Sequence, residues 1–365
     1  MLSDATIRSD RSSCRLRRYH DNVYITIYLT PVDFANVGQL LASLPHLTDL
    51  RNCTLSEYKI ISRNDAYQRI TALRLELDYP SKPFRDRALA ILPIICPMLK
   101  SLTIFAAGRR VSMVGLNGAN ALRQLENLSL IDIFAAKQDI LWMLYGRNTL
   151  KKLCIRDLKD FCFDPDTVQE VPDSIEALDL RWDTANMVPQ SVYETSLRII
   201  GRLPNLKELY QDNDVDSDFP GDGVDWRGLM PALSRLNKLR LWHLAERDRF
   251  SEVYPLGENL KCLKIVGACD ALDDVLQAIS TLAKLEELLI TDEYDVLYLE
   301  SQEILLLLAA GPVRRSLVTC SISLCTQGDQ RTESMLQYFI ENVECGFAKK
   351  AVGTRELLVT GHLVR

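Results

Sequence analysis

The chain has 365 residues, of which 47% are hydrophobic and 25% are charged, and its formal net charge is -6 at pH 7. This composition is typical of a globular protein, and the negative charge gives no general attraction to nucleic acid or to an anionic membrane. The longest uninterrupted apolar run, 304–310, is far shorter than the roughly 20 residues that a membrane span needs. We therefore expect no nucleic acid and no membrane as a partner.

The ten cysteines are scattered along the chain, without a C-x-x-C pair and without a secretory signal before them. Read as free thiols, they predict a reducing compartment, the cytoplasm or the nucleus. The alternative is an extracellular protein whose ends are closed by disulfides, which usually carries clustered cysteines behind a signal peptide.

The N-terminal segment, 1–20, is polar and rich in arginine, and we expect it to form a frayed leader. A mitochondrial presequence is the alternative, and Asp4 and Asp10 argue against it. From 22 to 29 the residues alternate strictly and are rich in β-branched and aromatic side chains. This pattern predicts the first strand of a sheet, and 33–44 is expected to follow as its helix.

A strand motif with the spacing L-x-x-L-x-L recurs about every 25 residues. In the copy LENLSL, the alternation predicts that Leu128 and Leu130 are buried while Asn127 and Ser129 face the other way. The first apolar residues of the copies are Leu47, Ile70, Leu99, Leu125, Leu150, Ile175, Leu206, Leu236, Leu260, Leu285 and, less clearly, Leu317.

Helical patterns lie between the copies of the motif. Apolar residues recur at helical spacing over 137–145, and Gly146 is expected to end that helix. Asp270 precedes a second pattern, with further carboxylates in its first turn. The segments 301–308 and 331–343 predict two more helices.

A strand and a helix that repeat with this period predict an α/β fold, a leucine-rich repeat solenoid or horseshoe. A parallel sheet would line its concave face, and helices would cover its convex face. We expect a leader over 1–20, a solenoid of about 11–12 repeats over 21–325, and a C-terminal helix and cap over 326–365.

Three phrases resemble those that begin repeats in the F-box/leucine-rich repeat protein family: ICPMLKSL at 95–102, LPHLTDL at 44–50 and LPNLKEL at 203–209. The resemblance extends over about 22–324, although the F-box itself is not found. It implies the substrate-recognition part of an F-box type (SCF) ubiquitin ligase, acting in ubiquitin-dependent protein degradation. It also implies a cullin-ligase adaptor as a second partner, if an F-box lies upstream.

Catalytic chemistry has little support in the sequence. The four histidines lie in different repeats and match no triad or metal spacing, and 115–121 lacks the lysine of a phosphate-binding loop. The acidic stretch 212–225 resembles a calcium loop, but Phe219 stands where such a loop needs glycine. We expect a solvated insertion there, or a loop that contacts a basic partner, and we expect no enzymatic activity, no cofactor and no metal site.

The sharpest site hypothesis comes from the two faces of the strands. If the first, fourth and sixth positions of the motif point inward, the third, fifth and seventh positions line the concave face, with equivalent residues about 4.8 Å apart on neighbouring strands. Residue types that dominate protein-binding hot spots gather at the fifth and seventh positions of the central copies. The expected partner-binding residues are Arg156, Arg181, Tyr210, Asp212, Arg240, Trp242 and Lys264. A solvated charged face without a partner is the alternative.

The sequence therefore predicts a protein-interaction module that binds a protein partner on its concave face. Two other functions stay open. One is a stand-alone scaffold with no ligase role. The other is a small-anion sensor, in which Arg156, Arg181, Arg240 and Lys264 hold an anionic ligand.

Overall fold

A computed structural model describes short strands between 6 and 33, then Leu41, and then 48–55, 65–77, 87–90, 92–111, 113, 116, 122–135, 137–158, 171–182, 190–212, 226–244, 257–269, 272–291, 312–317, 319–325, 346–352 and 356–362. The chain divides into two compact units. The first unit comprises Met1–Cys162, Asp166–Ile175 and Arg181–Asn186, and the second comprises Phe163–Pro165, Glu176–Leu180 and Met187–Arg365.

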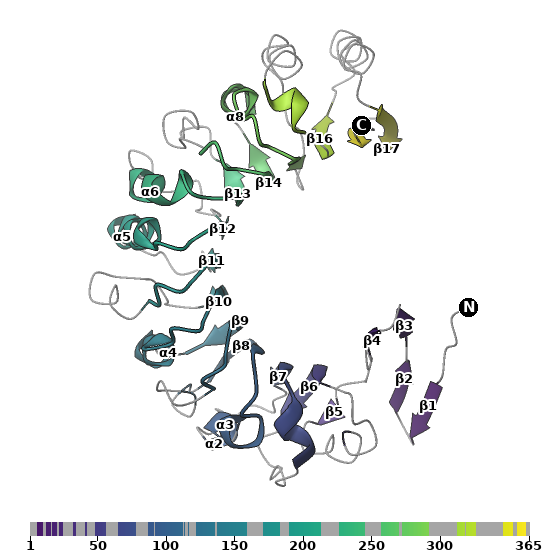
Figure 1. Ribbon diagram of the computed structural model, residues 1–365, viewed down its shortest axis with the longest axis vertical. Helices are drawn as coiled ribbons and strands as arrows, with labels where there is room; N and C mark the ends of the chain where they lie inside the picture. The colour runs from purple at the N-terminus through teal and green to yellow at the C-terminus, as the bar shows by residue number, and fades with distance from the viewer. Residues whose placement is uncertain are drawn as a thin grey trace. The chain divides into compact units, whose positions relative to one another are not determined.

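The first unit contains a parallel sheet with helices on one side (Figure 1). Its strands, in spatial order, are β5 (Val32–Asp33), β6 (Asp49–Leu55), β7 (Ala72–Leu77), β8 (Ser101–Arg110), β9 (Asn127–Phe134) and β10 (Lys152–Leu158). The helical segments are η2 (Asp65–Arg69), α2 (Arg87–Ala90), α3 (Leu92–Ile95) and α4 (Lys137–Leu144). Two short hairpins precede the sheet: β1 (Thr6–Ser9) with β2 (Ser12–Arg15), and β3 (Arg17–Tyr19) with β4 (Asn22–Tyr24).

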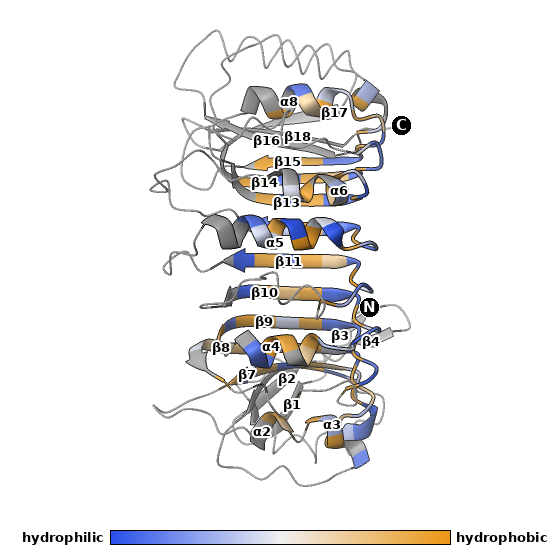
Figure 2. Cartoon of the chain, turned by 90° about the vertical axis from the view of Figure 1, so that its left-hand side faces the viewer, coloured by the Kyte–Doolittle hydropathy of each residue, from blue (hydrophilic) through white to orange (hydrophobic). Residues whose placement is uncertain are grey.

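The second unit repeats this arrangement. Its strands, in spatial order, are β11 (Ala177–Trp182, of which Arg181 and Trp182 belong to the first unit), β12 (Glu208–Asp212), β13 (Lys238–Leu244), β14 (Cys262–Cys269), β15 (Glu287–Thr291), β16 (Thr319–Cys325), β18 (Glu356–His362) and β17 (Gly346–Val352). Strands β12 to β16 pair in parallel, whereas β18 pairs antiparallel with both β16 and β17. The helical segments are α5 (Gln190–Arg202), η5 (Trp226–Leu229), α6 (Met230–Leu233), α8 (Leu272–Ser280) and η6 (Pro312–Arg315). Figure 2 shows α5 and α8 lying over the strands of this unit.

The predicted alternation of buried and exposed positions is confirmed. Leu128 and Leu130 of β9 are 1% and 0% exposed, while Asn127 and Ser129 are only partly covered. The residues at the fourth and sixth positions of other copies are also buried, namely Leu73, Leu75, Leu102, Ile104, Leu153, Ile155, Leu178, Leu180, Leu209, Gln211, Leu239, Leu241, Leu263, Ile265, Leu288 and Ile290. These side chains form the core between the strands and the helices.

Equivalent positions of neighbouring strands lie side by side within each unit. Leu128 of β9 pairs with Leu153 of β10, and Leu239 of β13 pairs with Leu263 of β14. The strand starts repeat one hydrogen-bond pattern. The backbone N–H groups of Lys151 and Lys152 both donate to Glu126 O, at 2.8 and 2.9 Å. The same pair of bonds recurs onto the carbonyls of Thr48, Thr71, Lys100, Glu176, Lys207, Asn237 and Lys261.

Two predicted helices are confirmed. The first runs from Lys137 to Leu144, and Gly146 follows it with a φ of 70°, a left-handed conformation that glycine adopts at little cost. The second runs from Leu272 to Ser280, after Asp270. The predicted helices at 301–308 and 331–343 lie outside the described residues.

The strand predicted over 22–29 forms differently from the expectation. Asn22–Tyr24 is a strand, but it pairs with Arg17–Tyr19 in an antiparallel hairpin, and the first strand of the parallel sheet is instead β5. An alternating pattern predicts a strand but does not predict which other strand it pairs with. A short connection favours pairing with the strand that is adjacent in the sequence. Asp33, predicted to start a helix, lies in β5; of the rest of 33–44 the structure describes only Leu41, which is helical.

A buried arginine of the first unit forms hydrogen bonds to main-chain carbonyls in the segments that connect β8 to β9 and β9 to β10. Arg147 is 4% exposed, and its guanidinium donates hydrogen bonds to Leu116 O at 2.8 Å, to Leu122 O at 3.3 Å and to Met143 O. Burial lowers the pKa of Arg147 to about 10, because a desolvated cation is disfavoured. The side chain thus satisfies carbonyl groups that would otherwise be buried without a donor.

The β8–β9 pair carries an irregularity. Its register shifts between Phe105 and Arg109, and Ala107, Gly108 and Asp132 have φ values of 49°, 70° and 51°. A β-bulge with left-handed residues accounts for the shift, since it inserts extra residues into one strand. A Cβ on Gly108 would lie 3.3 Å from Asp132 Oδ1, so the bulge also brings the two strands close together.

Candidate functional site

The face of each sheet opposite the helices, called the open face below, carries the third, fifth and seventh positions of the motif. Tyr210, Arg240 and Lys264 occupy the fifth position of β12, β13 and β14 and lie in register. All three side chains are partly buried. Three of the predicted partner-binding residues therefore form one row in the second unit.

The remaining predicted residues are divided between the units. Asp212 and Trp242 pair at the seventh position of β12 and β13, although their side chains lie outside what the structure describes. Arg156, which is partly buried on β10, and Arg181, which is exposed on β11, belong to the first unit. The structure thus groups five of the predicted positions on β12–β14.

Charged and polar residues at the third position extend the row into a cluster. Lys238 Nζ lies 2.9 Å from Glu208 Oε1, across β12 and β13. Lys264 Nζ lies 2.7 Å from Glu287 Oε1, across β14 and β15. The Cys262 thiol donates to Glu287 Oε2 at 3.2 Å, so Glu287 holds two neighbours at once.

Sequence reasoning missed Glu208, Lys238, Cys262 and Glu287, because it considered only the fifth and seventh positions. The signal that could have found them is in the same motif. The third position reads Glu, Lys, Cys and Glu over four consecutive copies, and opposite charges at equivalent positions of parallel strands come within pairing distance.

Hydrogen bonding and burial shift the pKa values of this cluster. The hydrogen bond that Lys238 donates to Glu208 raises the pKa of Lys238, and the hydrogen bond that Lys264 donates to Glu287 raises the pKa of Lys264. The hydrogen bond from Lys264 lowers the pKa of Glu287. Lysines and glutamate therefore stay ionised around neutral pH.

The two neutral members of the cluster are held in their protonated forms. Burial, followed by the hydrogen bond to Glu287, raises the pKa of the Cys262 thiol to about 12. Burial, followed by the charge of Glu208, raises the pKa of Tyr210. Cys262 is consequently a thiol at neutral pH and a poor nucleophile.

The open face of β8 and β9, in the first unit, is different in character. Ser101, Thr103 and Phe105 lie on β8, and they pair in register with Asn127, Ser129 and Ile131 on β9. These side chains are uncharged and partly exposed. A charged open face is thus not common to every strand of the motif.

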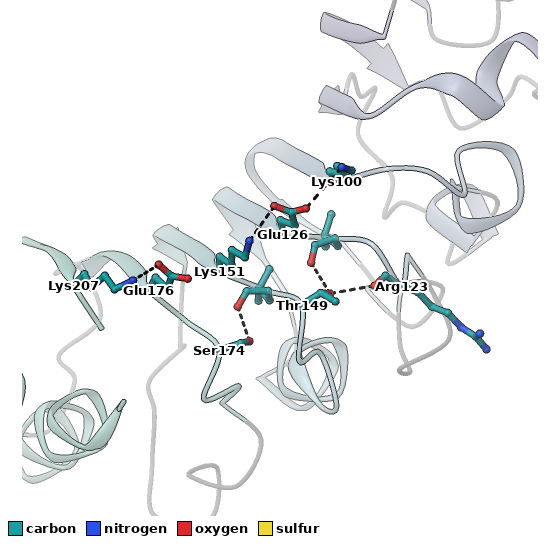
Figure 3. A network of polar contacts seen from close by, with 10 residues as sticks. Lys100, Arg123, Glu126, Thr149, Lys151, Ser174, Glu176 and Lys207 are labelled. Carbon is teal, nitrogen blue, oxygen red and sulfur yellow. Dashed lines mark hydrogen bonds and ion pairs between the residues drawn. The ribbon is translucent and has the colours of Figure 1, made fainter. Parts of the chain in front are cut away.

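A separate set of ion pairs lies at the second position, where the strands start (Figure 3). Glu126 lies 3.9 Å from Lys100 and 3.6 Å from Lys151 in the first unit. In the second unit, Lys207 lies 2.7 Å from Glu176, and Lys261 lies 2.8 Å from Glu286. These pairs are exposed, so each contributes only about 0–1 kcal/mol to stability.

Hydroxyl groups support the same edge of the first unit. Thr149 Oγ1 donates to Leu125 O at 3.0 Å, and Ser174 Oγ donates to Leu150 O at 2.7 Å, both visible in Figure 3. Each hydroxyl comes directly before the first apolar residue of its motif and bonds to that position in the preceding copy. The ion pairs and hydrogen bonds at the strand-start edge thus join neighbouring copies of the motif, and we assign this edge a structural role.

The described residues contain no helix with the length and apolar character needed to cross a membrane. Among the same residues, no three His, Cys, Asp or Glu side chains are grouped so that they could hold a metal ion. Comparison of the sequence with protein-family models and with curated proteins finds no match.

Proposed function

We propose that the chain is a leucine-rich repeat solenoid that acts as a non-catalytic protein-interaction module, and that the open face of β12–β15 binds its partner. By its resemblance at 95–102, 44–50 and 203–209, the partner is a substrate protein of an F-box type ubiquitin ligase in the cytoplasm or nucleus. A cullin-ligase adaptor would be the second partner.

The observation that carries this proposal is the row formed by Tyr210, Arg240 and Lys264. The strands hold these side chains at a fixed spacing, so little conformational freedom is lost when a partner binds. Tyrosine and arginine are also enriched among the residues that dominate binding energy at protein interfaces.

A small-anion sensor has less support than a protein partner. That function would use Arg156, Arg181, Arg240 and Lys264 together. Arg240 and Lys264 lie in register on β13 and β14, whereas Arg156 and Arg181 belong to the other unit. An anion that raised the melting temperature of the protein would revive the sensor, by mass action on the native state.

Affinity purification of the tagged chain from its native cells, followed by mass spectrometry, tests the proposal. The test variant combines Arg240→Ala with Trp242→Ala. The matched control combines Lys207→Ala with Lys261→Ala, two exposed lysines at the strand-start edge of the same unit. We expect specific partners to be retained by the wild-type and control proteins and lost from the test variant.

Two outcomes would change the conclusion. Equal recovery of every partner by the test variant would remove the open face of β12–β15 as the binding site. Recovery of substrate-like partners without any cullin-ligase adaptor would favour a stand-alone scaffold over the ligase role.

A further inference from the structure

The open face of β7–β10, in the first unit, has its charges on the two outer strands. Arg74 and Glu76 lie on β7, and Lys152 and Arg156 lie on β10. Between them, the third, fifth and seventh positions of β8 and β9 carry no charge. These positions of the four strands therefore hold three cations and one carboxylate, around a neutral centre.

Lys152 is a cation that can bind a further group. Its side chain is exposed, and none of the described residues forms an ion pair with it. Glu126, at the strand-start edge, forms ion pairs with two other lysines, Lys100 and Lys151. Arg156 is not counted as available, because it already has an interaction partner. The ammonium group of Lys152 thus offers its N–H donors to a ligand, and a carboxylate is the acceptor that its charge favours.

The carboxylate on β7 makes the other side of the face less favourable for an anion. Arg74 is exposed, but Glu76 lies two residues further along the same strand and on the same face. An anionic group near Arg74 is therefore also near a charge of its own sign. Attraction and repulsion together favour Lys152 as the position of an anionic group.

Uncharged donors and acceptors lie beside Lys152. The third position of β8, β9 and β10 reads, in register, Ser101, Asn127 and Lys152. The fifth position of β8 and β9 adds Thr103 and Ser129, also in register. Within the part of the chain that the structure describes, the hydroxyl and amide groups of these residues make no hydrogen bond. They are partly exposed, so a ligand meets groups that can both donate and accept.

Apolar side chains lie at the other end of β8 and β9. Phe105 and Ile131 occupy the seventh position in register, and both are partly exposed. Because a strand rises about 3.3 Å per residue, the seventh position lies about 13 Å from the third. A ligand that fits this face has an anionic group at one end, uncharged polar groups in the middle and an apolar group at the other end.

A polypeptide in extended conformation has this spacing. Its side chains alternate with the same period of two, so residues i, i+2 and i+4 on one side match the third, fifth and seventh positions of the strands. We infer that the open face of β8–β10 binds an extended segment of a partner protein, through an acidic residue on Lys152 and an apolar residue, four positions away, on Phe105 and Ile131. A serine or threonine between them bonds Thr103 or Ser129. This second surface goes beyond the proposed function, which concerns β12–β15.

The test uses the full chain and three fluorescein-labelled peptides, with binding measured by fluorescence anisotropy. The probe is Leu-Thr-Ser-Thr-Glu-Thr-Ser-Thr-Leu, in which leucine lies four residues from glutamate in either chain direction. One control replaces the glutamate by glutamine. The shifted control, Thr-Leu-Ser-Thr-Glu-Thr-Ser-Leu-Thr, has the same composition, but its leucines face away from the side of the glutamate. We expect the probe to bind about fivefold more tightly than the glutamine control and about tenfold more tightly than the shifted control.

Matched variants locate the site. Lys152→Gln should remove the preference for glutamate over glutamine. Lys151→Gln makes the same charge change on the exposed neighbouring residue, at the strand-start edge, and should keep the preference. Ile131→Thr, which retains a β-branched side chain, should reduce the preference for the probe over the shifted control. Thermal unfolding checks that each variant is folded, and the two lysine variants decide the result if Ile131→Thr is not.

Three outcomes would overturn the inference. The first is equal binding of the probe and the glutamine control by the wild-type protein. The second is an equal loss in Lys152→Gln and Lys151→Gln, because binding would then follow net charge and not the site. The third is equal binding of the probe and the shifted control, because an extended segment in register with the strands requires the spacing of four residues.

The inference and the proposed function fail separately. The variant with Arg240→Ala and Trp242→Ala should bind the probe as the wild-type protein does, and loss of the probe from it would place the binding on β12–β15 and overturn the inference. If the peptide test fails while native partners are still lost from that variant, the second surface is wrong and the proposed function stands.

Discussion

Lys264 Nζ lies 2.7 Å from Glu287 Oε1, so that this cation of the open face is paired with a carboxylate on the neighbouring strand. The Lys264 and Glu287 side chains remain 31% and 41% exposed, and solvent screening limits the stabilisation that the pair provides to about 0.5 kcal/mol. The pair positions Lys264 more than it stabilises the fold.

The first prediction concerns the acid stability conferred by this pair. Because Lys264 lowers the pKa of Glu287 in the folded state, its stabilisation is present above the unfolded pKa and is lost as the pH falls through the folded pKa. Glu287→Gln should therefore lower the melting temperature slightly at pH 7, and this difference should vanish between about pH 5 and pH 3. Circular dichroism melts across this range measure it. A difference that stays constant with pH would contradict the assignment.

The second prediction concerns the reactivity of Cys262. With its pKa raised to about 12, the thiol should react with iodoacetamide at least about tenfold more slowly in the folded protein than in urea. Peptide mass spectrometry after timed alkylation measures the rate. Glu287→Gln should speed the reaction only modestly, because burial is the larger cause of the shift. Rapid alkylation of the folded wild-type protein would show that Cys262 is not held as a thiol.

The third prediction tests the close approach of α5 to η5. A Cβ on Gly201 would lie 1.9 Å from Gly228 O, so Gly201→Ala should lower the free energy of unfolding by about 1–3 kcal/mol. Urea denaturation measures the change. Arg202→Ala is the control, since Arg202 is exposed on the same helix. Stabilisation by Gly201→Ala, the usual effect of alanine in a helix, would contradict the packing.

The fourth prediction tests the two faces of β9. Leu128 is 1% exposed, so Leu128→Ala should lower the free energy of unfolding by about 2–5 kcal/mol. Ser129→Ala, its neighbour on the open face, should change it by less than about 0.5 kcal/mol. Similar losses for the two variants, measured by urea denaturation, would mean that the faces are assigned wrongly.

The fifth prediction concerns Arg147. Arg147→Met keeps the unbranched stem of the side chain but removes the guanidinium donors to Leu116 O and Leu122 O, and it should lower the free energy of unfolding by about 2–3 kcal/mol. Asn148→Ala, at an exposed neighbouring position, should have little effect. A stable Arg147→Met variant would show that water replaces the guanidinium.

Much of the fold follows from local patterns in the sequence. The positions of Leu128 and Leu130 in the core follow from a period of two, and the end of α4 follows from Gly146, because both patterns act over a few residues. The partner of Asn22–Tyr24 could not be predicted, since alternation leaves the pairing open. The left-handed conformation of Ala107 could not be predicted from its residue type either, because alanine rarely adopts that conformation.

The site was predictable in part. Placing Tyr210, Arg240 and Lys264 at one motif position was enough to predict that they form a row. The contact between Lys264 and Glu287 joins the fifth position of one copy to the third position of the next. A diagonal contact of this kind depends on side-chain rotamers, which a reading of equivalent positions does not include.

The main-chain hydrogen bonds at the strand starts affect how freely the residues of the open face can be substituted. At Glu126 and its equivalents, two main-chain N–H groups bind one main-chain carbonyl, so the alignment of successive strands does not depend on which side chains are present. Substitutions on the open face can therefore accumulate without disturbing the framework beneath them. A chain built in this way can acquire a new binding partner by changing a few surface residues, while its scaffold is inherited intact.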